Sequence, residues 1–441
     1  MSIWRERGRR LLRYPSAVAG LALVALLIAI SLYTVVAIPY TTAVEQWRGG
    51  EAWRFHPVNA SPVWLDRLRG GHSARTIHVQ GGEVETVRTF AGGHQQRQRL
   101  VFHYRYDGFP NEINLFLAAS GISGEPFVNL TWQRPDGSEV ALGNHRVSGH
   151  VRVALSQDWA LERRLEQPAH VGLLQVPDAA EPKPLHGQYT LLIDSVLFGD
   201  GAELAADLVL YGRVHGLAGT DHQRRDLLLA LLWGTPVALA FGLLAAAGTT
   251  VTTLIIAAAG VWYGGRVDAT IQRLTEINMI LPLLPILVMI GTLYSTSIWL
   301  MLGVVVALGL FSASIKMYRA MLLPLREAPW VEAARAYGAS DARIILRYLV
   351  PRLLPVLIPT LVTLIPAFVF LEASLAVLGL GDPLLPTWGK VLNDAREQSA
   401  LYFGHYYWIV GPAALLLLTG LGFAMLGFAL DRVFNPRLRG R

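Results

Sequence analysis

The clearest chemical pattern in this sequence lies at 332–351, which reads EAARAYGASDARIILRYLVP. Glu332 begins a short run of helix-forming residues that stops at Gly338, and Asp341 begins a second run that carries Arg343. Glycine tolerates positive φ and commonly ends helices, and a serine or aspartate can cap the helix that follows. The pattern predicts two short helices at an angle with charged side chains on their surface, which indicates binding rather than catalysis.

Two interpretations of this segment follow from its residues. Ala333 and Ala334 are small enough to let another surface approach closely, so that a partner protein could grip the turn and transmit motion through it. Alternatively, the segment forms an amphipathic helix that lies on anionic lipid. The residues alone leave both interpretations open.

Polar side chains inside apolar segments form the second set of candidates. Glu372 lies within the apolar run 354–379, and an ionisable group at membrane depth is a functional candidate because its burial is costly. It could instead pair near the surface with Lys390 or Arg396. Glu372 and Asn278 are the two candidate residues for a solute path.

No pattern in the sequence supports catalysis by this chain. It has no cysteine, which excludes disulfides and thiolate chemistry. Neither a G-x-x-x-x-G-K-[ST] phosphate loop nor a G-x-S-x-G nucleophile motif occurs, and the 12 histidines show no metal-ligand spacing. We therefore expect no catalytic residue, no metal and no cofactor, and any ATP hydrolysis must come from a partner.

The composition indicates an integral membrane protein. Hydrophobic residues make up 53% of the 441 residues and charged residues only 16%, a balance typical of chains that cross a bilayer. The net charge of +6 could indicate nucleic-acid binding, but the arginines cluster beside apolar runs. That placement is typical of the positive-inside rule, so we expect contact with lipid and no nucleic acid.

Apolar runs long enough to cross a bilayer lie near 17–38, 234–262, 277–294, 298–316, 354–379 and 408–430. Arginine-rich segments precede the first run, follow the last, and separate the second from the third and the fourth from the fifth. Six spans put all these segments on one side, which the positive-inside rule makes the cytoplasm. The sequence predicts a multi-pass protein of a bacterial or archaeal plasma (inner) membrane with both termini cytoplasmic.

The segment 40–216 has a different pattern of apolar and polar residues from the apolar runs. We expect it to be extracytoplasmic. Stretches that alternate apolar and polar residues, such as RLVFHYRY and YTLLIDSVLF, are separated by turn signals. This spacing predicts a β-sandwich-like domain, with a helical excursion near 156–168. The expected fold is an all-α membrane core with this domain inserted between the first two transmembrane helices. The chain then divides into 1–39, 40–216 and 217–441.

The segment at 332–351 resembles the EAA loop of ATP-binding cassette (ABC) importer permeases, with Glu332, Ala333, Ala334 and Gly338 in place. Further motifs resemble those of the dipeptide, oligopeptide and nickel importer permeases: GTDHQRRDLL (219–228), YGGRVDATIQRLTEI (263–277), LEASLAVLGLGDPLLPTWGKVLNDAR (371–396) and FNPRLR (434–439). Arg224 stands where that family usually has glycine, and the exterior segment has no counterpart in it.

The resemblance implies a type I ABC importer permease with six transmembrane helices. It makes the EAA loop, here about 327–351, a coupling helix that sits on an ATPase and in which five residues would act: Glu332, Ala333, Ala334, Gly338 and Arg343. The implied partners are cytoplasmic ABC ATPase subunits, a second permease subunit distinct from this chain rather than a second copy, and an extracytoplasmic solute-binding protein. The implied function is uptake of peptides or a related small solute such as nickel complexes.

Two rival functions fit parts of the same pattern. The first is a permease-like subunit of an ABC exporter or envelope-remodelling complex, in which the exterior domain holds a large partner. The second is a membrane-anchored ligand sensor, although one membrane helix would suffice for that role. A carbohydrate-active enzyme would need a carboxylate pair, and the acids of the exterior segment lie in turn-like settings where acids are ordinary.

Overall fold

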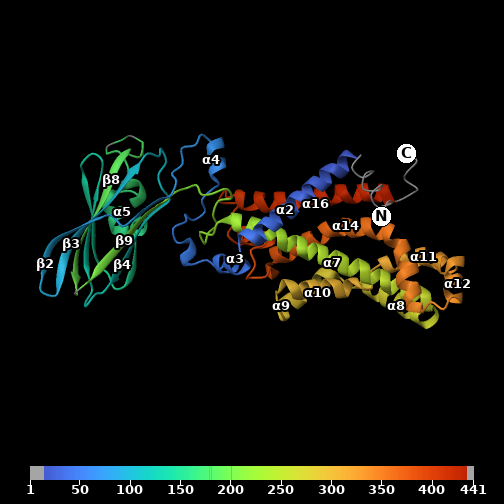
Figure 1. Ribbon diagram of the computed structural model, residues 1–441. Coiled ribbons are helices and arrows are strands. Elements are labelled where there is room, and N and C mark those ends of the chain that lie inside the picture. The colour runs from blue at the N-terminus through green and yellow to red at the C-terminus, as the bar shows by residue number, and fades with distance from the viewer. Residues whose placement is uncertain (1–13, 178, 180, 200, 435–441) are drawn as a thin grey trace. The chain divides into compact units, whose positions relative to one another are not determined.

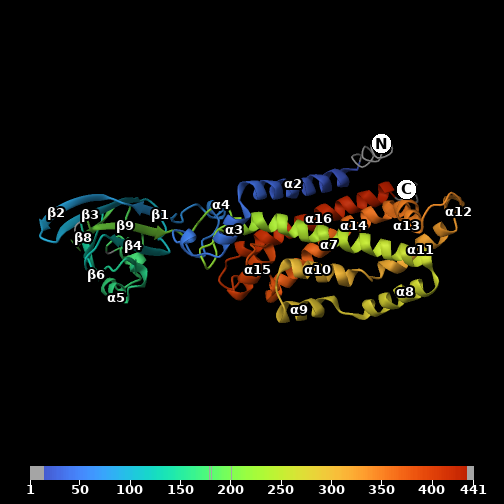
Figure 2. The same cartoon turned by 60° about the horizontal axis from the view of Figure 1, so that its bottom comes forward.

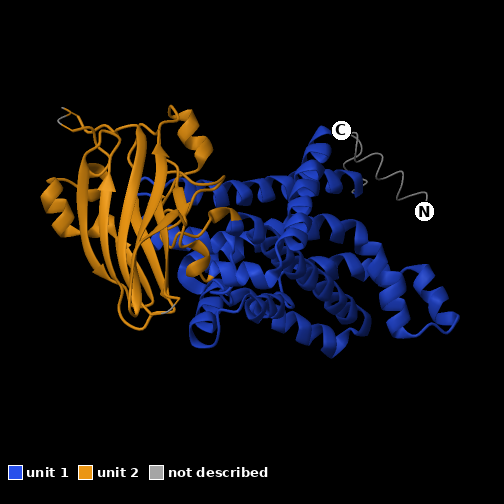
Figure 3. Ribbon diagram, turned by 60° about the vertical axis from the view of Figure 1, so that its left-hand side comes forward, with its two compact units in different colours: residues 1–47, 229–441 blue, residues 48–228 orange. Residues whose placement is uncertain are grey.

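The computed structural model describes residues 14–177, 179, 181–199 and 201–434. The chain forms two compact units (Figure 3): unit 1 comprises Met1–Trp47 and Leu229–Arg441, and unit 2 comprises Arg48–Leu228. The N-terminal arginines before Tyr14 and all but the first residue of the FNPRLR motif lie outside the described residues.

Unit 2 is built around two antiparallel sheets with the strand orders β1-β9-β4-β7 and β2-β3-β8-β5-β6. The strands are β1 (Ile77–Gln80), β2 (Glu83–Phe90), β3 (Gly93–Tyr104), β4 (Glu112–Ser120), β5 (Phe127–Gln133), β6 (Glu139–Arg146), β7 (His150–Ala154), β8 (Gly187–Phe198) and β9 (Glu203–Tyr211). The expected β-rich domain is therefore present, and every strand pairing within it is antiparallel.

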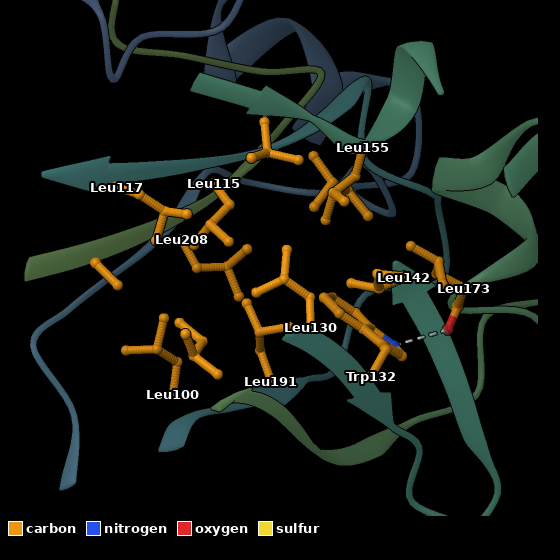
Figure 4. Close-up of a cluster of buried hydrophobic side chains, with 14 of the residues drawn as sticks. Leu100, Leu115, Leu117, Leu130, Trp132, Leu142, Leu155, Leu173, Leu191 and Leu208 are labelled. Atoms are coloured by element: carbon orange, nitrogen blue, oxygen red, sulfur yellow. Dashed lines mark hydrogen bonds between the residues drawn. The ribbon is translucent and has the colours of Figure 1, made fainter. Parts of the chain in front are cut away.

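The core of unit 2 lies between the two sheets (Figure 4). Leu115 and Leu208 from the four-stranded sheet share one buried cluster with Leu130 from the five-stranded sheet. Trp132 joins the same cluster, and its indole N–H donates a 3.1 Å hydrogen bond to the carbonyl of Leu173. These positions alternate with outward-facing residues, which is the period that a half-buried strand requires.

Two strands escaped prediction because they lack this alternation. All residues of β2 are exposed, and β6 has only one buried residue. The expected helical excursion is confirmed: a 3₁₀ turn at Leu155–Gln157 leads into α5 (Trp159–Leu165). The remaining short helices of unit 2 are a 3₁₀ turn at Glu51–Trp53, α4 (Val63–Leu68) and α6 (Ala169–Gly172).

Unit 1 is helical. Four of its helices are long and apolar enough to cross a membrane, namely Pro15–Ala37, Leu227–Tyr263, Asp341–Leu380 and Tyr407–Phe434. Figure 1 labels them α2 (Pro15–Ala37), α7 (Leu227–Tyr263), α14 (Val350–Leu375) and α16 (Tyr407–Phe434). Close packing of α2 on α16 depends on small residues, since a Cβ at Gly20 would lie 2.9 Å from the carbonyl oxygen of Gly422.

Two of the predicted spans are broken rather than straight. The predicted span 277–294 crosses a 77° bend between α8 (Gly265–Ile280) and α9 (Leu283–Leu293). The predicted span 298–316 crosses a 47° bend between α10 (Ile298–Gly309) and α11 (Ser314–Arg326). Hydropathy averages over a window and does not detect such a bend, whereas a proline such as Pro282 interrupts helical hydrogen bonding there. The described residues thus include four helices long and apolar enough to cross a membrane, or up to six such segments if each bent pair counts as one span.

The remaining helices of unit 1 are short. They are α3 (Tyr40–Trp47), α12 (Pro329–Ala336), α13 (Asp341–Ile344) and α15 (Trp388–Glu397).

Candidate functional site

The turn formed by residues 329–344, called the 329–344 turn below, follows from local sequence rules. Pro329 occupies the first helical position of α12, where its missing N–H costs nothing. The helix ends at Ala336, and Gly338 adopts a φ of +74°, which L side chains rarely adopt. The Gly338 N–H donates to the carbonyl of Arg335 over 2.9 Å. The backbone conformation at this position therefore favours glycine.

The helix after the turn is longer than the sequence predicts. Instead of a second short helix, α13 continues through a π-helical turn at Ile345–Leu349 and through α14, and this helical segment is kinked only near its end, at Gly379 with a φ of +87°. Pro351, which cannot donate a backbone hydrogen bond, closely follows the π-helical turn. The 329–344 turn is thus joined directly to α14, whose 26 residues are enough to cross a bilayer.

One face of the 329–344 turn is buried in unit 1. Val331, Ala334 and Ile344 join a core cluster with Trp262 of α7 and Tyr318 of α11. The guanidinium of Arg335 also lies over the Trp262 ring, 4.3 Å from its centroid, which adds a cation–π contact. The turn is held on the helices by packing rather than by its backbone alone.

The opposite face carries most of the residues that the sequence singled out. Glu332, Ala333, Gly338 and Arg343 are all exposed. Ala334 is only 7% exposed and packs against the chain itself. Of the two alanines that sequence reasoning treated alike, only Ala333 is therefore available to a partner or to lipid.

A charged contact that sequence reasoning missed supports the helices beside this turn. The guanidinium of Arg319 in α11 donates to both carboxylate oxygens of Asp268 in α8, with an Nε–Oδ1 distance of 2.9 Å and an Nη2–Oδ2 distance of 2.6 Å. Such a two-point contact fixes geometry as well as charge. Its partners lie 51 residues apart, so no spacing rule could have identified the pair.

Glu372 is buried within an apolar helix, as its position in the sequence predicts. It is only 6% exposed in α14, and its side chain hydrogen-bonds Thr387. Lys390 instead pairs with Asp394 at 2.9 Å, and Arg396 contacts Asn393. The alternative that Glu372 pairs with Lys390 or Arg396 is therefore not observed, because both cations contact neighbours on their own helix.

Asn278 lines a cavity of about 280 Å³ among α7, α8, α9, α10 and α14. Its amide donates to the carbonyl of Phe311 over 3.3 Å. Glu372 is not among the residues that line this cavity. The structure therefore does not bring the two candidate path residues together.

The segment before α7 contains a buried ion pair. Arg225 Nε donates to Asp221 Oδ2 over 2.5 Å, and the two side chains are only 5% and 1% exposed. Asp221 Oδ1 also accepts from the backbone N–H groups of Gln223 and Arg225, each at 2.9 Å. A buried carboxylate needs several such partners, and the segment 219–228 supplies them locally.

Arg224, the departure from the family pattern, adopts a φ of +66° although it is not glycine. Its guanidinium donates to Glu112 Oε2 over 2.6 Å and to the carbonyl of His56 over 2.7 Å. It also lies 4.3 Å from the centroid of the Tyr211 ring. These contacts offset a backbone conformation that costs an L residue about 1–2 kcal/mol.

Two substitutions of Arg224 separate the stability that its side-chain contacts contribute from the cost of its backbone conformation. Arg224→Gly and Arg224→Ala both lose every side-chain contact, but only alanine keeps a Cβ at positive φ. We expect the midpoint of thermal unfolding of the full chain in detergent to be highest for the wild type, lower for Arg224→Gly and lowest for Arg224→Ala. The free energies of unfolding of the two variants should differ by about 1 kcal/mol. Equal midpoints for the two variants would contradict this account.

Titratable groups gather beside Arg224. The rings of His56 and His215 are 4.2 Å apart between centroids. Burial, followed by the neighbouring His215, lowers the pKa of His56 to about 4, so it is neutral at neutral pH. Burial raises the pKa of Asp226, whose Oδ1 accepts from Leu228 N over 2.8 Å at the start of α7. Among the described residues, no group of three or more such side chains could hold a metal ion.

Comparison with known proteins matches the helical part of the chain. Residues 230–440 match the family described as binding-protein-dependent transport system inner membrane component. A peptide transport system permease protein of Brucella suis is 34% identical over 229 residues, which cover 51% of this chain and 74% of the relative.

Two further relatives show the same coverage pattern. The glutathione transport system permease protein GsiD of Escherichia coli is 30% identical over 231 residues, or 50% of this chain and 72% of the relative. The dipeptide transport system permease protein DppC of Bacillus subtilis is 27% identical over 222 residues, or 50% of this chain and 68% of the relative. The strands of unit 2 lie outside the matched family segment.

Proposed function

The chain belongs to the family of binding-protein-dependent transport system inner membrane components, and we propose that it is the permease subunit of an ABC importer for peptides or a related small solute. It forms one half of the translocation path, and a distinct second permease forms the other half. ATP hydrolysis takes place on separate cytoplasmic ATPase subunits.

The observation that carries this proposal is the geometry of the 329–344 turn. Its inner face is buried against α7 and α11, and its outer face exposes Glu332, Ala333 and Arg343. Since Asp341 begins a helical segment that continues through α14 and has its kink only at Gly379, a force applied to the turn acts directly on a membrane span. An interfacial helix that only lay on lipid would not need this connection.

Coupling then follows from mechanics rather than from chemistry on this chain. When the ATPases close, they displace the 329–344 turn, and the helix that runs from Asp341 through α14 tilts with it. Tilting of packed helices opens a path on one side of the membrane and closes it on the other. The exposed carboxylate of Glu332 and the guanidinium of Arg343 are the contacts that the ATPase holds.

The proposed arrangement across the membrane follows the positive-inside rule. The 329–344 turn lies in the cytoplasm, and unit 2 lies outside the cytoplasm, where a solute-binding protein delivers the solute. A mild-detergent purification of the tagged chain tests the set of partners. The proposal requires an ATPase with a phosphate loop and a second permease to copurify, and recovery of the chain without any ATPase would reject it.

A topology experiment checks the orientation independently. An alkaline phosphatase reporter fused after Gly143 in unit 2 is expected to be active, because that enzyme folds only outside the cytoplasm. The same reporter fused after Ser340 is expected to be inactive. A green fluorescent protein reporter at the two sites should give the opposite pattern, and the reverse result for both reporters would overturn the orientation.

Unit 2 supports a second candidate function. Its strands span a range outside the matched family segment, and an importer that relies on a binding protein does not need so large a domain. A permease-like subunit of an exporter or envelope-remodelling complex would use such a domain to hold a large partner. Copurification of the ATPase with a large envelope protein and without any solute-binding protein would favour this function.

A further inference from the structure

The two broken helix pairs of unit 1 meet at one cavity. Figure 2 shows the pairs α8–α9 and α10–α11 side by side. Leu281 and Leu283 from the first bend and Ser312 and Ser314 from the second line the same cavity of about 280 Å³. Two interruptions of different helices at one place indicate that the breaks serve the cavity rather than arising separately.

The protein itself satisfies some of the backbone groups that the second bend releases. Thr253 Oγ1 donates to the carbonyl of Gly309 over 3.1 Å, and the Asn278 amide donates to the carbonyl of Phe311 over 3.3 Å. Irregular backbone at membrane depth is tolerated only where protein buries it or where it lines a cavity. In transporters, such discontinuous helices commonly form the solute site.

The cavity lining is uncharged. Its polar side chains are Thr249, Asn278, Ser312 and Ser314, and the rest of its surface is formed by glycine and apolar residues such as Phe368. In the part of the chain that the structure describes, the hydroxyls of Ser312 and Ser314 have no protein hydrogen-bond partner. A charged terminus or carboxylate placed here would be buried without a counter-charge, which costs several kcal/mol.

The size of the cavity limits what it can hold. Its volume of about 280 Å³ lies just below the roughly 300–1,000 Å³ typical of small-molecule pockets. That is room for a single amino-acid residue but not for a whole peptide. An apolar side chain fits the walls, and a neighbouring amide fits the two free hydroxyls.

We propose that this cavity is a subsite for one uncharged apolar residue of a transported peptide, with Ser312 and Ser314 hydrogen-bonding its amide groups. The proposal rests on the permease function proposed above. It adds that the translocation path selects peptides by the side chain of one residue, which must be uncharged and apolar. Peptides with an apolar central residue occupy the cavity, whereas peptides with a charged central residue do not.

A single-cysteine experiment tests the subsite, because the chain has no cysteine of its own. Ser314→Cys is purified with its copurifying subunits, and modification of this chain by N-ethylmaleimide is followed by mass spectrometry. The tripeptide Ala-Phe-Ala is added at ten times the concentration that half-saturates its binding to the purified complex. It is expected to slow the labelling of Ser314→Cys about tenfold. Ala-Asp-Ala at the same concentration is expected to leave the rate unchanged.

Thr292→Cys is the matched control. Thr292 is exposed on α9 and does not line the cavity, so neither tripeptide should alter its labelling. Equal protection of both cysteines would mean a global conformational change and would overturn the subsite, as would equal protection of Ser314→Cys by both tripeptides.

Uptake of labelled Ala-Phe-Ala by proteoliposomes that contain the wild-type complex separates the two proposals. Uptake without protection of Ser314→Cys would reject the subsite and leave the permease function standing. Absence of both uptake and protection would reject peptide transport together with the subsite.

Discussion

Replacing Glu332 with arginine is expected to lower ATP-driven uptake by at least about tenfold, equivalent to a coupling loss of about 1.4 kcal/mol. Glu332 is exposed in the first turn of α12, so the change does not disturb the buried face. It reverses the charge that the ATPase would contact, and a like charge at an interface costs several kcal/mol. Uptake into proteoliposomes and ATP hydrolysis by the same complex are the two measurements.

The pattern of the two measurements decides the interpretation. Because the chain should still fold and insert, the Glu332→Arg protein is expected in the membrane at wild-type amounts. A matched control is Glu397→Arg at the end of α15, where the glutamate side chain is 51% exposed and lies far along the chain from the turn. Unchanged uptake in Glu332→Arg, or an equal loss in both variants, would count against the coupling role.

Asp221→Asn is expected to destabilise the segment that leads into α7 by about 3–5 kcal/mol, the range found when a buried ion pair loses one partner. Asparagine keeps the size of the side chain but leaves the guanidinium of Arg225, only 5% exposed, without its carboxylate. Hydrogen–deuterium exchange of the full chain in detergent measures the effect. The amides of Gln223 and Arg225, which donate to Asp221, should exchange at least about a hundredfold faster.

An exposed pair of similar length provides the control. Arg54 and Glu51 are 2.8 Å apart, but their side chains are 36% and 85% exposed. A surface pair of this kind contributes at most about 1 kcal/mol, so Glu51→Gln should change local exchange by less than about fivefold. If Asp221→Asn had an effect as small as that of Glu51→Gln, burial would not be the source of its stability.

Some features could be predicted from the sequence because they depend on neighbours along the chain. Strand alternation in RLVFHYRY and YTLLIDSVLF identified β3 and β8, since a strand with one buried face requires a period of two. The break at Gly338 was predicted because only glycine readily adopts its φ of +74°. The apolar length of Leu227–Tyr263 was sufficient to predict a membrane helix.

Other features of the same segments could not be predicted from neighbouring residues along the chain. Hydropathy predicted an apolar run near 298–316 but not its 47° bend, since a window average contains no direction. Ala333 and Ala334 are adjacent and chemically identical, yet Ala333 is exposed and Ala334 is buried. The rotation of the helix against α7 and α11 decides which of them faces inward.

The sequence by itself determined the class of this protein: a chain with several long apolar helices, a β-rich segment and the motifs shared with importer permeases. Only the tertiary structure decided which side chains meet. Arg224 and Glu112 are 112 residues apart, and the two bends that share a cavity belong to different helices. Local conformation follows from the preferences of each residue and its neighbours, whereas these contacts exist only after distant segments have packed and excluded water.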